Sequence, residues 1–176
     1  MAHKNNSTGP SISPAKIEEG IIEPSVHLIV FKLGNEDYAI RIEQVKEVNI
    51  TPEIIRMPQT ASFIKGVANI RGDIIAIMDL EERFDLPVRE ASDRLKNTYT
   101  LVIESGDINI GILVKDVPQS LTVPVSKIDK TPGVIQSVNI SESYISGIAK
   151  YEGKLVIILD IQKILTFEQI EQLQVL

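Results

Sequence analysis

The sequence contains no cysteine and no tryptophan, and its only histidines are His3 and His27. Without cysteine there can be no disulfide, no thiolate zinc ligand and no cysteine nucleophile. Two histidines provide little for a metal centre or for histidine-assisted nucleophilic catalysis. No phosphate-cradling loop of the GxGxxG or GxxxxGK[ST] type is present either. The sequence therefore predicts a protein with no cofactor and no metal site.

Positive charge and long apolar runs are also scarce. Lysine and arginine number 18 against 24 aspartates and glutamates, which gives a net charge of −6 at pH 7. A nucleic-acid binder needs surplus cations to displace phosphate counterions, so no nucleic-acid partner is expected. No apolar run approaches the ~18 residues of a membrane span, and the N-terminus has no signal-peptide core. We expect a cytoplasmic protein that does not insert into a membrane.

Aliphatic β-branched residues are abundant instead. Isoleucine (29) and valine (15) make up a quarter of the 176 residues, and such side chains suit a pleated surface better than a helix. The composition predicts a mostly β fold, and the length fits one domain or two very small ones. Alternation and short apolar runs predict strands at His27–Leu33, Tyr38–Ile42, Ile74–Met78, Thr100–Glu104 and Ile108–Val114.

Short helices and connections are predicted between and around these strands. A spacing of three between apolar residues favours a helical turn within Arg41–Val48. Asp79 precedes Leu80 as a helix N-cap would. The remaining predicted segments are a flexible N-terminal tail (1–24), a solvated charged connection (81–97) and an amphipathic C-terminal helix (166–176).

The most informative feature is an internal duplication. Residues Phe63–Leu80 align without gaps on Tyr144–Ile161 at an offset of 81, and Val30–Val45 aligns on Val102–Val117 at an offset of 72. The nine extra residues of the second copy must lie within residues 122–143. Self-similarity of this length and order predicts two packed copies of one small β unit.

Each unit has about the length of a five-stranded barrel, and closing the sheet removes most exposed edges. The first barrel is expected at residues 25–86 and the second at residues 98–165. The duplication also allows strands to exchange between the two copies.

The two copies differ at the tip of the repeated turn. Where the first copy has Lys65, Asn69 and Arg71, the second has Ser146, Lys150 and Glu152. Arg71 is either an ordinary solvated turn residue or a recognition group, since its rigid fork of five donors suits a carboxylate or a partner backbone. Val45 and Val48 fit either a core or a contact surface. Asp79 and Asp160 share one cap position, which favours a structural role over acid–base chemistry.

Several motifs resemble the CheW-type chemotaxis coupling proteins. The family's Phe-Ile-Lys-Gly-Val-x-Asn-Leu-Arg-Gly block, leading to Asp-Leu, is matched by Phe63–Leu80. The opening Val30–Tyr38, the segment Val45–Val48 and the strand Gly111–Val117 also fit, in the family's order. The resemblance covers about residues 27–165.

The resemblance implies two SH3-like five-stranded barrels on a shared core and a non-enzymatic adaptor. Such an adaptor bridges the cytoplasmic tip of methyl-accepting chemoreceptors and the regulatory domain of the chemotaxis histidine kinase. The helical receptor tip would lie in the groove between the barrels, and alternating kinase and adaptor would form rings beneath membrane-anchored receptor arrays. The same module serving a type IV pilus or gliding pathway is an alternative. A small β-barrel hydrolase using surface carboxylates is another.

Matching positions carry the family's partner-binding roles onto this chain. In the first copy they imply partner coupling, with a cationic partner for Glu47, at Val45, Glu47, Gly66 and Arg71. In the second copy they include Gly111 and Val117. The loop from Ile128 to Val134 corresponds to the kinase-facing loop, and it contains Asp129 and Lys130, where the family often has an arginine.

Overall fold

The computed structural model describes residues 22–87, 98–130 and 140–164. Several sequence predictions lie outside these ranges: residues 1–21 of the N-terminal tail, residues 88–97 of the charged connection, Val134 and the C-terminal helix. Within the described ranges, no helix is long and apolar enough to cross a membrane.

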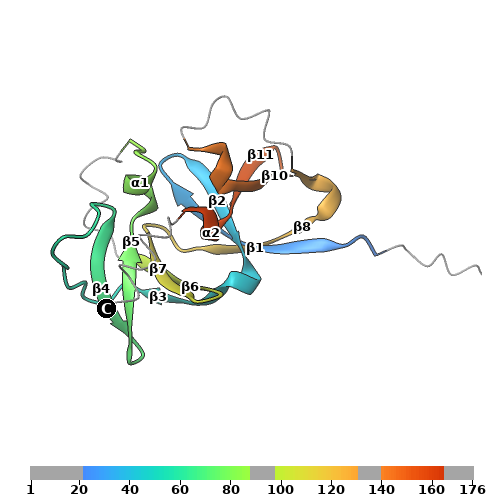
Figure 1. Cartoon of the computed structure of the whole chain (residues 1–176). Helices are drawn as coiled ribbons and strands as arrows, with labels where there is room; N and C mark the ends of the chain where they lie inside the picture. Colours follow the sequence, from blue (N-terminus) through green and yellow to red (C-terminus); the bar gives the residue numbers. More distant parts are fainter. Residues whose placement is uncertain (1–21, 88–97, 131–139, 165–176) are drawn as a thin grey trace, which may run out of the picture.

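The described chain forms two antiparallel-rich sheets, which confirms the predicted mostly β fold (Figure 1). The first sheet has the order β8-β1-β2-β11-β10-β9 and the second the order β3-β6-β7-β5-β4. The strands of the first sheet are β1 (Ser25–Leu33), β2 (Glu36–Arg41), β8 (Gln119–Pro124), β9 (Ile128–Asp129), β10 (Ile145–Tyr151) and β11 (Lys154–Leu159). Those of the second are β3 (Val45–Ile50), β4 (Ile64–Ile70), β5 (Asp73–Met78), β6 (Tyr99–Ser105) and β7 (Ile108–Val114).

The helical elements are short. They are the α-helices α1 (Leu80–Arg83) and α2 (Ile161–Ile164) and the 3-10 turns η1 (Ile42–Gln44), η3 (Val125–Lys127) and η5 (Glu142–Tyr144). Asp79 caps α1 as predicted, because its carboxylate accepts hydrogen bonds from the backbone N–H groups of Glu81 and Glu82.

Both sheets close into barrels. In the first sheet, β8 and β9 lie at opposite edges, yet only η3 and its cap residues connect them in the chain. In the second sheet, the chain that leaves β3 reaches the opposite edge, where Ile55 bridges Val67 of β4. We call these the β1 barrel and the β3 barrel. Since β8 and β9 form one interrupted segment, each barrel has the predicted five strand positions, with little free edge.

Strands are exchanged between the two halves of the sequence. The β1–β2 hairpin pairs in parallel with β11 through Tyr38 and Ile157, so it completes the barrel of the second half. Reciprocally, the β6–β7 hairpin pairs in parallel with β5 through Ile110 and Ala76. Neither barrel therefore corresponds to residues 25–86 or 98–165 alone, and the exchange that the duplication allowed is present.

The duplicated segments fold alike. The two ends of β4, β5 and α1 recur at an offset of 81 in β10, β11 and α2. The turn residues Arg71 and Glu152 share positive φ angles, 53° and 47°. Each copy also has a register shift at the start of its hairpin, next to Gly66 or Gly147. This agreement confirms the repeat inferred from the sequence.

Three apolar clusters fill the molecule. The β1 barrel encloses Leu28, Ala39, Val123, Ala149, Val156 and Ile158. The β3 barrel encloses Ala68, Ile70, Ile75, Ile77 and Val102. A larger cluster between the barrels, here called the shared core, takes side chains from both, including Tyr38, Ile40, Met78, Leu80, Leu101, Ile103, Ile145 and Ile161.

Tertiary packing changes three local predictions. The alternation in β2 predicts one buried face, but Tyr38, Ala39 and Ile40 are all buried, because the shared core covers one face and the β1-barrel interior the other. The helical turn within Arg41–Val48 is limited to η1, and Val45 already begins β3. The predicted solvated connection is wrong at its start, where Glu81 lies in α1 and is buried.

Gly66 is predicted to be essential for closing the β3 barrel. It has a φ of 141°, and a Cβ there would lie 2.1 Å from the carbonyl oxygen of Ile55. We expect Gly66→Ala to lower the free energy of unfolding by about 3 kcal/mol, because strain and overlap add. The control Gly153→Ala has φ 75° and open space around it, so about 1 kcal/mol is expected. Urea unfolding measures the free energy of unfolding of both variants. Equal losses in the two variants would contradict the special role of Gly66.

Candidate functional site

The tip of the β4–β5 hairpin carries the first group of candidate binding residues. The Asn69 side-chain oxygen accepts a hydrogen bond from the backbone N–H of Gly72 at 2.8 Å, which holds the turn. Arg71 reaches from this turn to β3, where its Nε donates to Glu47 Oε2 at 2.8 Å. The resemblance implied that Glu47 pairs with a nearby cation, and in the structure it pairs with Arg71; the role of the two residues in partner binding stays a prediction.

The two members of this pair differ in exposure. The side chain of Arg71 is 77% exposed, whereas that of Glu47 is 19% exposed. Glu47 therefore holds one edge of the guanidinium, and the remainder faces solvent, where it can donate to a carboxylate or carbonyl of a partner. An ion pair this exposed contributes about 0–1 kcal/mol to stability, so its contribution to folding is small.

A second group on β3 is apolar and exposed. Val48 and Ile50 are 42% and 67% exposed. Their cross-strand neighbours on β6 are Leu101 and Tyr99, which pack in or against the shared core. Val45 also packs partly against the shared core. The three β3 residues, here called the apolar row, therefore continue the shared core to the surface at the seam between the barrels.

Ion pairs border the apolar row. The ammonium group of Lys46 lies 3.9 Å from Asp73 and 3.5 Å from Glu104. An apolar centre with a charged rim is typical of a protein-binding surface.

Gly66 and Gly111 are buried, so the structure gives them packing roles and no exposed side of their own. At Gly111, a Cβ would lie 2.6 Å from side-chain carbons of Ile77 and Thr100. Gly111 is the repeat equivalent of Ala39, which fills the interior of the other barrel. Substitutions at either glycine would therefore act on a partner only by displacing neighbouring strands.

The described part of the kinase-facing loop implied by the resemblance, residues 128–130, borders an open depression on the β1 barrel. This depression has a volume of about 960 Å³. Its lining residues are Val123, Pro124, Ser126, Lys127, Ile128, Asp129, Lys130, Lys150, Tyr151, Glu152 and Gly153. It thus joins three predicted site residues to the tip of the β10–β11 hairpin, the repeat equivalent of the Arg71 turn.

Val117 lies apart from both groups. It is 61% exposed and follows β7, where the chain crosses from the β3 barrel to the β1 barrel. It borders a depression of about 420 Å³ together with Phe31, Lys32 and Asp37 of the β1–β2 hairpin. The predicted site residues therefore form three surfaces: the Glu47–Arg71 pair with the apolar row, the loop depression, and the Val117 crossing.

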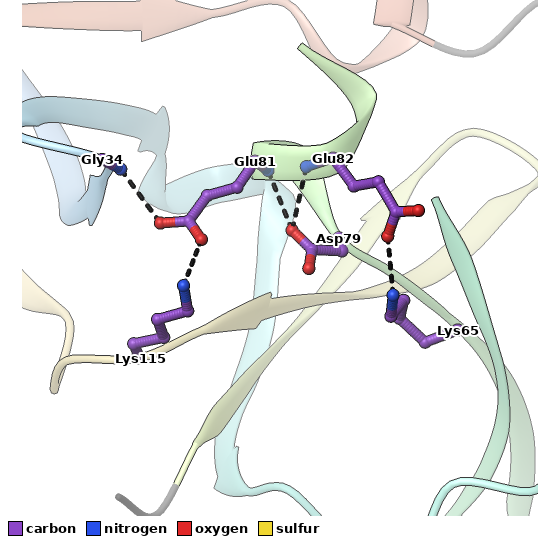
Figure 2. A network of polar contacts seen from close by, with 6 residues as sticks. All are labelled: Gly34, Lys65, Asp79, Glu81, Glu82 and Lys115. Carbon is purple, nitrogen blue, oxygen red and sulfur yellow. Dashed lines mark hydrogen bonds and ion pairs between the residues drawn. The ribbon is translucent and has the colours of Figure 1, made fainter. Parts of the chain in front are cut away.

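Sequence analysis missed a polar network around α1 (Figure 2). Glu81 accepts hydrogen bonds from the Gly34 backbone N–H and from Lys115 Nζ. Glu82 pairs with Lys65 at 2.6 Å. The many charged residues that follow Asp79 in the sequence predicted solvated side chains there. Only the tertiary contacts show that Glu81 is buried. No sequence signal distinguishes it from its neighbour Glu82.

The three carboxylates around α1, those of Asp79, Glu81 and Glu82, are engaged in structural contacts. Burial raises the pKa of Asp79, and the N–H donors of α1 partly oppose that rise. The bond from Lys65 lowers the pKa of Glu82. Within residues 22–87, 98–130 and 140–164, no group of three acidic or histidine side chains is placed to hold a metal ion.

The fold and these surfaces define a double-barrel binding module. The family model described as the CheW-like domain matches residues 27–169. The chain therefore belongs to the CheW-like family, whose members are non-enzymatic adaptors.

Individual relatives agree with this assignment. The chain is 32% identical over 141 residues to the chemotaxis protein CheW of Klebsiella aerogenes, covering 80% of this chain and 82% of that protein. It is 32% identical over 148 residues to CheW of Bacillus subtilis, covering 84% and 91%. The crystal structure of the scaffolding protein TtCheW from Thermoanaerobacter tengcongensis matches with a TM-score of 0.72 at 28% identity, covering 83% and 96%.

Asp79 is predicted to make stability depend on pH. Because its pKa is raised by burial in the folded state, the folded chain holds this proton to a higher pH than the unfolded chain does. Stability should therefore fall as pH rises from about 4 through the raised pKa. Asp79→Asn keeps an acceptor for the cap and removes the titration, so its stability relative to the parent should increase across this range.

Asp79→Ala is the control for the cap itself. Its free energy of unfolding should be about 1 kcal/mol lower than that of the parent over the whole pH range, because no side-chain acceptor remains for the N–H groups of α1. Denaturant titrations between about pH 3.5 and pH 7, the range in which a buried aspartate titrates, measure all three proteins. Parallel stability curves for the parent and Asp79→Asn would contradict the assignment.

Proposed function

We propose that this protein couples methyl-accepting chemoreceptors to the chemotaxis histidine kinase on the cytoplasmic side of the membrane. The observation that carries the proposal is the CheW-like match over residues 27–169, which spans both barrels. The protein would transmit receptor state by holding the two partners together. Alternation of kinase and adaptor would then extend the contacts into rings.

The receptor-binding role falls best on the seam. A helical receptor tip would present apolar residues at intervals of three and four along one face. The apolar row, Val45, Val48 and Ile50, offers complementary apolar area at the edge of the shared core. Lys46 lies next to Val45 on β3, and Arg71 pairs with Glu47 of the same strand; these cationic groups suit a partner with acidic residues beside its apolar stripe.

The kinase-binding role falls best on the loop depression of the β1 barrel. Ile128 supplies partly buried apolar surface there, and Asp129 and Lys130 are exposed. The kinase regulatory domain, which the family resemblance gives the same double-barrel fold, would meet this barrel end with one of its own. Two separate surfaces allow both partners to bind at once.

Reversal of the charge at Arg71 tests the seam. We expect Arg71→Glu to weaken binding of a purified receptor-tip fragment about tenfold, about 1.4 kcal/mol, because two carboxylates then face each other at Glu47. Combining Arg71→Glu with Glu47→Arg should restore part of the affinity, since the pair is re-formed. Calorimetric titration measures both, and Lys154→Glu, at an exposed position of β11 in the other barrel, is the control for net charge.

The two possible failures have different meanings. If the parent protein binds neither the receptor tip nor the kinase regulatory domain, the coupling role is wrong. If the parent binds both partners and Arg71→Glu binds them equally well, only the proposed role of Arg71 is wrong.

Reversal of the charge at Lys130 tests the division of labour. We expect Lys130→Glu to weaken binding of the kinase regulatory domain about tenfold, with the salt dependence of association altered as well. Binding of the receptor tip should not change, because the loop depression lies on the β1 barrel and the apolar row on the β3 barrel. An equal loss for both partners would contradict two separate surfaces.

A type IV pilus pathway is a second candidate setting for the same adaptor role. Protein PilI of Pseudomonas aeruginosa is 33% identical over 89 residues, covering 51% of this chain and 48% of that protein. Affinity purification from the native cell separates the two settings, since each would yield a different kinase and receptor. The double-barrel fold and the proposed surfaces are the same in both.

A further inference from the structure

The geometry points to Glu81 and Lys115 as positioning residues that hold the two barrels in one relative orientation. The contact with Gly34 completes this set, here called the seam tie. Its effect on receptor binding rests on the proposed function, whereas its effect on barrel orientation does not. Glu81, Lys115 and Gly34 do not line the partner-binding surfaces described above.

The seam tie joins three segments that come from both barrels (Figure 2). Glu81 lies in α1, directly after the β3-barrel strand β5, and it is 7% exposed. Its Oε1 accepts from the backbone N–H of Gly34 at 2.9 Å, in the β1–β2 turn of the β1 barrel. Its Oε2 accepts from Nζ of Lys115, the first residue of the segment that crosses from β7 of the β3 barrel to β8 of the β1 barrel. One carboxylate therefore spans the seam.

A second contact crosses the seam from the same helix. Nη2 of Arg83 donates to the Tyr144 hydroxyl at 3.1 Å and to the Ile164 carbonyl at 3.0 Å. The guanidinium also lies 4.9 Å above the ring of Phe63. Glu81 and Arg83 lie on the same helical turn and contact two different parts of the β1 barrel. Two contacts restrict the rotation of one barrel relative to the other as well as the distance between them.

The repeat shows that these side chains are not required to build the hairpin and helix. At the equivalent positions of α2, Glu81 is replaced by Gln162 and Arg83 by Ile164, yet β10, β11 and α2 have the same bounds at the offset of 81. Gln162 is also exposed, whereas Glu81 is buried. The charged side chains are therefore a property of the junction and not of the repeated unit.

Physical chemistry explains why a polar tie would specify orientation. An apolar interface tolerates small sliding movements of packed elements. A buried carboxylate does not, because the cost of its desolvation is no longer offset once its hydrogen-bond donors move away. The apolar row continues the shared core, and the Val117 depression is bordered by both the crossing segment and the β1–β2 hairpin. A fixed orientation therefore sets the shape of both surfaces.

The test measures barrel orientation in the free protein. The chain has no cysteine, so Glu53→Cys on the β3 barrel and Lys154→Cys on the β1 barrel allow two spin labels to be attached. Pulsed electron–electron double resonance should give one narrow distribution of distances between the two spin labels in this double-cysteine background. Adding Glu81→Gln should broaden or shift it, since the charge that holds Lys115 is lost. Lys115→Arg should keep it narrow, because the ion pair is preserved.

Glu82→Gln is the matched control. It removes the same charge from the same helix, but Glu82 pairs with Lys65 of β4, so both partners belong to the β3 barrel. We expect its distance distribution to stay as narrow as that of the parent. Should Glu81→Gln fail to fold, Lys115→Met takes its place, because the bond from Gly34 to Glu81 is then retained.

An unchanged distance distribution in Glu81→Gln and Lys115→Met would overturn the inference, as would equal broadening in Glu82→Gln. Receptor-tip affinity is the second readout. A loss of about 2- to 30-fold in Glu81→Gln, and none in Glu82→Gln, is expected for an effect transmitted through orientation. Broadened distances with unchanged affinity would overturn the link to coupling, and a parent that binds no receptor would instead reject the proposed function.

Discussion

The reciprocal parallel pairing of β2 with β11 and of β7 with β5 is the interaction on which the rest of the structure depends. Because each half of the chain donates a hairpin to the other, neither barrel closes with its own half alone. The same exchange places the shared core between the barrels, where Tyr38 and Ile40 of one half meet Leu101 and Ile103 of the other. Two small barrels, each marginal in size, thereby form a single cooperative structure.

The exchange also determines how the binding surfaces of this adaptor are arranged. An adaptor acts by holding separate surfaces at fixed positions, and here the surfaces lie on barrels that are locked into each other. The apolar row lies where the shared core reaches the surface, and Arg71 pairs with Glu47 of the same strand. The loop depression lies on the other barrel. A movement of one barrel relative to the other would therefore change the relative position of the two surfaces.

Much of the fold could be predicted because the duplication repeats local physics. Gly66 and Gly147 recur where a strand passes close to the next, and each aspartate before a short helix recurs with it. The sequence allowed an exchange of strands but could not decide it, since the two copies of a hairpin have similar apolar patterns and either could pair with a given strand. Burial of Glu81 was also missed, because its partners, Gly34 and Lys115, are distant in the chain.

For the candidate site, the resemblance gave one contact that the structure contains. The resemblance placed Glu47 beside a cation, and the hairpin turn brings Arg71 there. It could not show that Gly111 is enclosed by Ile77 and Thr100, because burial depends on which barrel a strand joins.

Native-state hydrogen exchange tests the central claim, that the two barrels are one cooperative unit joined by exchanged strands. Amides in the central strands of each barrel, such as those of Ala39 in β2 and Ile110 in β7, should exchange by global opening with the same free energy and the same response to denaturant. Exchange of one barrel's amides at a clearly lower free energy, while the other barrel remains protected, would contradict it.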